Sequence, residues 1–194
     1  MHQQSPGSPH MPDFVYVLFA IDVVILLITL AGTLWSFAFP DRRIWPPPHR
    51  YSWQHVLSWA CFFAVCGLNT ALLLLDWNSW IFKSDLRFVI GIPVTLLGGF
   101  LAVWGVVTLG AMNSSGLKGG FVAAGPYRFT RNPQYLGDNI LFFGVSIIAN
   151  SLLLWITHAL LILVFVMAPL TEERWLEDQY GQAYREYRRK IRRF

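Results

Sequence analysis

Long apolar runs dominate this sequence and restrict what the chain can fold into. Residues 14–39, 56–75 and 88–111 each reach the roughly 20 apolar residues that a helix needs to cross a bilayer. A further run, 136–170, is interrupted only at Asn150-Ser151, which predicts two helices, 136–149 and 152–170, joined by a very tight turn. The first helix of this pair is short for a full span. We therefore expect an all-α integral membrane protein with about five transmembrane helices.

Composition agrees with this class and argues against a soluble enzyme. Of the 194 residues, 55% are hydrophobic and only 13% are charged. No apolar stretch is left over to form a soluble domain, so we predict a single membrane domain over 13–194, preceded by a disordered leader over 1–12. The histidines are scattered and match no metal-ligand spacing. We expect the lipid bilayer as a partner, and neither a metal nor a nucleic acid.

The distribution of Lys and Arg predicts an orientation in the membrane. The loop after the first run, the loop after the third run and the C-terminal tail together hold 13 of the 15 Lys and Arg residues. Basic residues collect on the cytoplasmic side of membrane proteins. This places the N-terminus outside and the C-terminus in the cytoplasm.

A polar stretch, "GPYRFTRNPQYLGD" at 125–138, follows the third run on the predicted cytoplasmic side. Its tyrosines offer aromatic faces, and Arg128 and Arg131 offer fixed positive charge suited to a carboxylate or phosphate. A helix that starts after Pro133 would direct free N–H groups at the same place and favour an anion. Tyr and Arg are also ordinary at headgroup level. The residues alone leave a ligand site and an interfacial anchor equally open.

Two adjacent carboxylates, Glu172 and Glu173, stand where the last apolar run meets water. They would suit a cationic ligand, or would pair with Arg128 and Arg131. Beyond them, apolar positions recur at helical spacing among basic residues, which predicts an amphipathic interfacial helix whose distal arginines adhere to lipid headgroups. These apolar positions are Leu176, Tyr180, Tyr184, Tyr187 and Ile191.

The two stretches together resemble a known superfamily. "GPYRFTRNPQYLG", a short helical hairpin and "EERWLEDQYGQAYREY" are similar to the C-terminal signature of the isoprenylcysteine carboxyl methyltransferase and phospholipid methyltransferase superfamily. The resemblance covers about residues 105–194. It implies a membrane-embedded enzyme that uses S-adenosylmethionine without a Rossmann domain, and this chain has no G-x-G-x-x-G motif.

The resemblance also implies where the methyl donor binds, in a region of about 112–194. Glu172 would bind its amino acid moiety, with Glu173 beside it as the base if the acceptor is an amine. Arg128 or Arg131 would hold the carboxylate of the acceptor. The residues expected to line the donor are Gly119, Gly120, Phe121, Val122, Tyr127, Asn132, Pro133, Gln134, Tyr135 and Glu172.

Two positions depart from the superfamily pattern. Asn132 stands where His is usual, so a proton-transfer role is not expected there. Ala168 stands where an Arg contacts substrate in eukaryotic prenylcysteine enzymes, which is why the acceptor carboxylate is assigned to Arg128 or Arg131.

We expect direct, in-line methyl transfer at the membrane–cytosol interface to the carboxylate of a prenylcysteine-type lipid that enters from the bilayer. A phospholipid amine, such as phosphatidylethanolamine, is the alternative acceptor. Two other classes stay open: an NADPH-dependent membrane sterol reductase, and a non-enzymatic membrane adaptor that acts through its basic tail.

Overall fold

The computed structural model describes residues 12–194, so the predicted leader lies outside the described residues apart from Pro12. That part of the chain is helical, with no β-strand. The elements are α1 (Asp13–Ala38), η1 (Pro40–Arg42), α2 (Trp53–Leu75), α3 (Leu86–Leu109), α4 (Ala111–Ser114), η2 (Gly125–Arg128), α5 (Pro133–Ala149) and α6 (Leu152–Lys190).

Four of these helices, α1, α2, α3 and α6, are long and apolar enough to cross a membrane. The remaining long helix, α5, has 17 residues and is short, as the sequence predicted. The prediction of an all-α membrane fold is confirmed.

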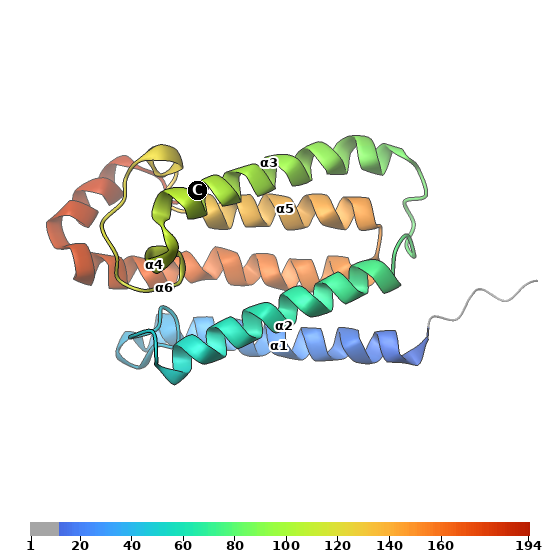
Figure 1. Ribbon diagram of the computed structural model, residues 1–194, viewed down its shortest axis with the longest axis horizontal. Helices are drawn as coiled ribbons and strands as arrows, with labels where there is room; N and C mark the ends of the chain where they lie inside the picture. The colour runs from blue at the N-terminus through green and yellow to red at the C-terminus, as the bar shows by residue number, and fades with distance from the viewer. Residues whose placement is uncertain (1–11) are drawn as a thin grey trace, which may run out of the picture.

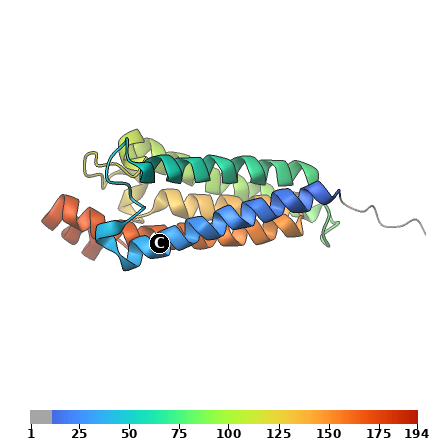
Figure 2. The ribbon, with the colours of Figure 1, turned by 90° about the horizontal axis from the view of Figure 1, so that it is seen from below.

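The long helices lie alongside one another and alternate in direction (Figures 1 and 2). The α1–α2 loop, the segment between α3 and α5, and the end of α6 lie at one end of the bundle. The α2–α3 loop and the α5–α6 turn lie at the other. The three segments rich in Lys and Arg therefore share one end, and its cytoplasmic placement stays a prediction.

Helices α3 and α5 pack backbone against backbone along a glycine seam. A Cβ added to Gly98 of α3 would lie 2.3 Å from Leu141 N, and one added to Gly137 of α5 would lie 2.3 Å from Ala102 N. Small residues allow this close approach inside a membrane, where apolar burial gives little drive for association. The seam holds the start of α5 beside the end of α3.

A polar contact joins three of the helices inside the bundle. The side-chain amide of Asn69 on α2 donates to Asp22 Oδ2 on α1 at 2.8 Å. Its carbonyl oxygen accepts from Thr157 Oγ1 on α6 at 2.7 Å. Asp22 is fully buried, and a carboxylate at this depth needs such a partner.

The tight turn between α5 and α6 forms as predicted. Asn150 adopts the left-handed conformation with φ 48°, and Ser151 caps α6 by accepting from Leu154 N at 3.1 Å. The Asn150 side chain also accepts from Phe82 N of the α2–α3 loop at 2.9 Å. The turn thus connects α5 and α6 with the α2–α3 loop at this end of the bundle.

The C-terminal segment differs from the prediction. Helix α6 does not end near 170 but continues to Lys190, with a sharp change of direction at Gly181, where φ is 56° and ψ is −126°. The last residues fold back over the bundle end (Figure 1). Tyr184, expected on a membrane-facing side, is only 2% exposed because it packs against protein.

Candidate functional site

A cavity opens at the bundle end where the polar segments meet. It is lined from five parts of the chain: the α1–α2 loop, the end of α3 with α4, the segment that follows, the start of α5, and α6. The lining residues are Trp45, Leu109, Asn113, Ser114, Gly116, Gly120, Phe121, Val122, Tyr127, Arg131, Asn132, Gln134, Tyr135, Glu172, Trp175, Leu176, Tyr180, Tyr184 and Tyr187.

Most of the residues expected to line a donor are among them. Gly119 and Pro133 are not, although each adjoins a lining residue in sequence. Of the three residues predicted to be catalytic, Arg131 lines the cavity, whereas Arg128 and Glu173 do not. Most of the predicted cofactor residues therefore converge in space. Of the predicted catalytic residues, Arg131 and Glu173 are in contact, and Arg128 lies apart from them.

Glu172 is held in a fixed orientation at the cavity wall. Its Oε1 accepts from Trp45 Nε1 at 2.6 Å and from the Tyr135 hydroxyl. Hydrogen bonds to a carboxylate are stronger than neutral ones and fix its orientation. Within the described residues, both of its hydrogen bonds end on Oε1, which leaves Oε2 to accept from a ligand.

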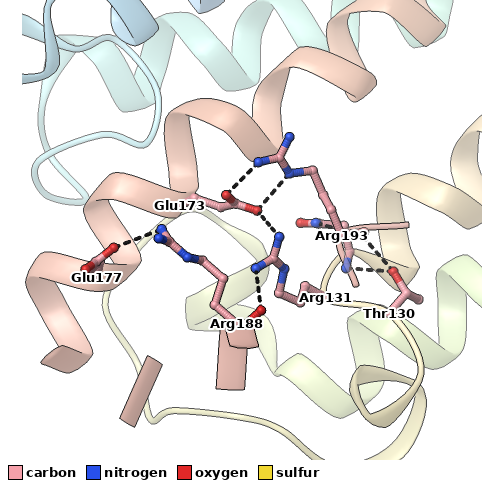
Figure 3. Close-up of polar contacts among 7 residues, drawn as sticks. Thr130, Arg131, Glu173, Glu177, Arg188 and Arg193 are labelled. Atoms are coloured by element: carbon pink, nitrogen blue, oxygen red, sulfur yellow. Dashed lines mark hydrogen bonds and ion pairs between the residues drawn. The ribbon is translucent and has the colours of Figure 1, made fainter. Parts of the chain in front are cut away.

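Glu173 is not among the residues that line the cavity, and it contacts two arginines (Figure 3). Arg193 binds it through two contacts of 2.8 Å, Nε to Oε1 and Nη2 to Oε2. Arg131 Nη2 lies 2.7 Å from the same Oε1. Glu173 is 8% exposed and both of its oxygens are engaged. Two arginines thus occupy both oxygens of Glu173 in this structure, and its role as a base stays a prediction.

The two arginines of the polar stretch face different surroundings. Arg131 reaches from the Glu173 pair to the cavity wall, and its Nε is buried with no hydrogen-bond partner in the described part of the chain. Ser114 Oγ, also on the wall, is buried and unpartnered in the same way. Arg128 instead lines a separate groove beside Lys190. Unpaired buried donors are costly, so Arg131 and Ser114 favour a polar ligand in the cavity.

The glycine-containing segment before η2 is shaped by Asn113. The Asn113 side chain donates to Gly120 O at 2.8 Å and accepts from Gly119 N at 2.8 Å. Tyr180 OH donates to Gly119 O at 3.1 Å. A Cβ at Gly119 would lie 2.6 Å from Asn113 Oδ1, so the segment approaches α4 closely only because that position is glycine.

Aromatic rings form the remaining wall of the cavity. The Phe121 ring centroid lies 5.3 Å from that of Tyr180 and 5.6 Å from that of Tyr187. Tyr127 is 5% exposed. Burial, and to a lesser degree the nearby Glu172 and Tyr187, raises the pKa of the Tyr127 phenol well above its usual range. Tyr127 thus stays neutral and presents an aromatic surface.

A family model described as phospholipid methyltransferase matches residues 86–183, half of the chain. The chain belongs to this family. The predicted superfamily is thereby confirmed, and the protein is a membrane methyltransferase whose family implies S-adenosylmethionine as the usual methyl donor. The searches of curated proteins and of solved structures found no match. The matched residues include most of the cavity wall but stop before Tyr184.

Sequence reasoning missed several residues of this phospholipid methyltransferase family member. Trp45 stands in "WPPPHRY", a proline-rich stretch in the N-terminal half, outside the range of the resemblance. Asn113 lies outside both quoted stretches, and Tyr180 lies within the second one but was assigned to the membrane surface. The tyrosine spacing in the tail was visible in the sequence, but it was assigned to lipid rather than to the cavity.

Proposed function

We propose that this protein is an S-adenosylmethionine-dependent methyltransferase acting at the membrane–cytosol interface on a lipidic acceptor, most favourably the carboxylate of a prenylcysteine-type lipid. The observation that carries the proposal is the anchored Glu172. It is the only carboxylate among the described residues that line the cavity, aromatic rings line the cavity with it, and its two hydrogen bonds both end on Oε1.

The residues present fit the donor. Glu172 Oε2 suits the ammonium group, and the unpaired Arg131 Nε with Ser114 Oγ suits the carboxylate group. The rings of Phe121 and Tyr180 suit the adenine, and tyrosine faces favour a cation such as a sulfonium. Bound S-adenosylmethionine would supply an electrophilic methyl group at this place.

The ion pairs of Glu173 favour a carboxylate as the acceptor. A carboxylate is already a nucleophile near neutral pH, so it needs no base. An amine must first lose a proton, and Glu173 cannot take it while two arginines hold both of its oxygens. What the protein would contribute is alignment and exclusion of water, and alignment is worth up to about 7–11 kcal/mol in favourable intramolecular cases.

A phospholipid amine is the second candidate, because the matched family is described as phospholipid methyltransferase. The two acceptors differ in their product. Methylation of a carboxylate gives an ester that base hydrolyses to methanol, whereas methylation of an amine gives a base-stable product. Transfer of a labelled methyl group to each lipid, followed by mild base, separates them.

Glu172→Gln tests the donor site. Losing a charged hydrogen-bond partner costs about 1.5–3 kcal/mol, so we expect the affinity for S-adenosylhomocysteine to fall by roughly tenfold to a hundredfold. Equilibrium binding to the detergent-purified protein measures this. Asp178→Asn, at an exposed position two turns along α6, is the matched control and should bind as wild type. Wild-type affinity in Glu172→Gln would overturn the assignment.

A further inference from the structure

The segment after Gly181 contributes Tyr184 and Tyr187 to the cavity wall. We propose that residues 182–194 form a lid over the donor site, hinged at Gly181, and that Arg193 is the positioning residue that latches it. This inference rests on the proposed function. The family match ends at residue 183, so the role of these residues comes from their contacts in this chain.

The hinge lies at a single residue. Gly181 is the point inside α6 where the backbone leaves the helical conformation, with φ 56° and ψ −126°. A Cβ there would meet nothing within 4 Å. Space is therefore free around the hinge residue itself, and the conformational freedom of glycine permits the bend. Hinges of closing segments are short stretches that absorb such a change.

The inner side of the lid forms part of the cavity. Tyr184 and Tyr187 line it, and Tyr184 is almost fully buried. Tyr187 OH donates to Tyr127 O at 2.7 Å, and its ring meets Phe121 edge-on. Opening the lid would thus remove two aromatic residues from the wall and expose the donor to water.

The end of the lid is fastened through its backbone to the polar stretch before α5. Arg131 N donates to Arg192 O at 2.9 Å. Thr130 Oγ1 and Asn132 Nδ2 both donate to Arg193 O, at 2.8 and 3.1 Å. Asn132 thus uses its side-chain amide to hold the tail, a role that requires no titration.

The latch is an ion pair between the lid and the helix before the hinge. The Arg193 guanidinium binds the Glu173 carboxylate through two parallel contacts, and Arg131 shares that carboxylate (Figure 3). A second pair, Arg188 to Glu177 at 2.9 Å, joins the lid to the helix before the hinge. Bidentate pairing of this kind is geometrically specific. Because Glu173 adjoins Glu172 in sequence, the latch also fixes the turn of α6 that presents the donor-binding carboxylate.

The test is the dissociation rate of S-adenosylhomocysteine from Arg193→Ala in the full-length, detergent-purified protein. An unlatched lid opens more often, so we expect dissociation roughly tenfold faster than in wild type, with Arg193→Lys in between. Arg192→Ala is the matched control, because Arg192 contributes its backbone carbonyl to the fastening and its side chain is absent from the ion pairs of the described residues.

Hydrogen exchange of the wild-type protein gives an independent readout. Bound S-adenosylhomocysteine should slow amide exchange in 182–194, because the closed lid keeps its hydrogen bonds. The lid proposal would be overturned by equal dissociation rates in Arg193→Ala and wild type, or by amide exchange in 182–194 that is unchanged when ligand binds. Neither result would contradict the donor site. Failure of the wild-type protein to bind S-adenosylhomocysteine would overturn both proposals.

Discussion

Trp45 shows how one side chain links the two halves of the chain at the site. It comes from the α1–α2 loop and donates to Glu172 on α6 at 2.6 Å. Its ring also packs against Gly116, where an added Cβ would lie 2.7 Å from Trp45 Cη2. In the proposed function, the N-terminal half therefore completes the donor site instead of serving only as a membrane anchor.

We predict that Trp45→Phe weakens the binding of S-adenosylhomocysteine by roughly tenfold, because it removes a charge-assisted hydrogen bond of about 1.5–3 kcal/mol while keeping an aromatic ring. Isothermal titration in detergent measures the change. Trp53→Phe, at a side chain 62% exposed on α2, should bind as wild type. Equal affinities in the two variants would show that Trp45 does not orient Glu172.

At the scale of elements, the packing of α3 on α5 positions the start of α5, where Gln134 and Tyr135 reach the cavity. Gly105 lies near the end of α3 that is predicted to face the cytoplasm. A Cβ added at Gly105 would lie 2.9 Å from Gln134 N, so this close approach of the two helices requires glycine. The Gln134 N–H therefore lies against α3. Within the proposed donor site we therefore assign the carboxylate group of the donor to Arg131 and not to the N-terminus of α5.

The glycine seam between α3 and α5 allows a stability prediction, and the neighbouring glycine, Gly99, serves as its control. Gly98→Ala places a methyl group 2.3 Å from a backbone nitrogen, so the helices must separate, and overpacking of this kind costs about 1–3 kcal/mol. Gly99→Ala meets only Leu141 Cδ1 at 3.4 Å, an ordinary contact. Thermal melts in one detergent should show a lower melting temperature for Gly98→Ala alone. A matching loss in Gly99→Ala would contradict the close packing at Gly98 as the cause.

At the scale of the whole molecule, the sequence predicted the spans, the tight turn at Asn150 and about half of the cavity wall. The length of each apolar run predicts a span, and the two motif stretches predict the site residues, so each of these features can be read from residues that are close together in the chain. The partners of Glu173 and Trp45 could not be predicted, because each contact joins residues far apart in the chain. Arg193, for example, reaches Glu173 only because α6 bends at Gly181. The same bend turned the tail tyrosines from the predicted membrane surface toward the cavity.

The central claim is that this bundle end binds a methyl donor through Glu172. The most direct test is a thermal melt of the detergent-purified protein with S-adenosylhomocysteine, compared with NADPH. A ligand at about 100 times its Kd stabilises a protein by about 2.7 kcal/mol, which a melt detects. We predict a shift with S-adenosylhomocysteine alone, and its loss in Glu172→Gln. A shift with NADPH alone would favour a reductase, and no shift with either ligand would contradict the donor site altogether.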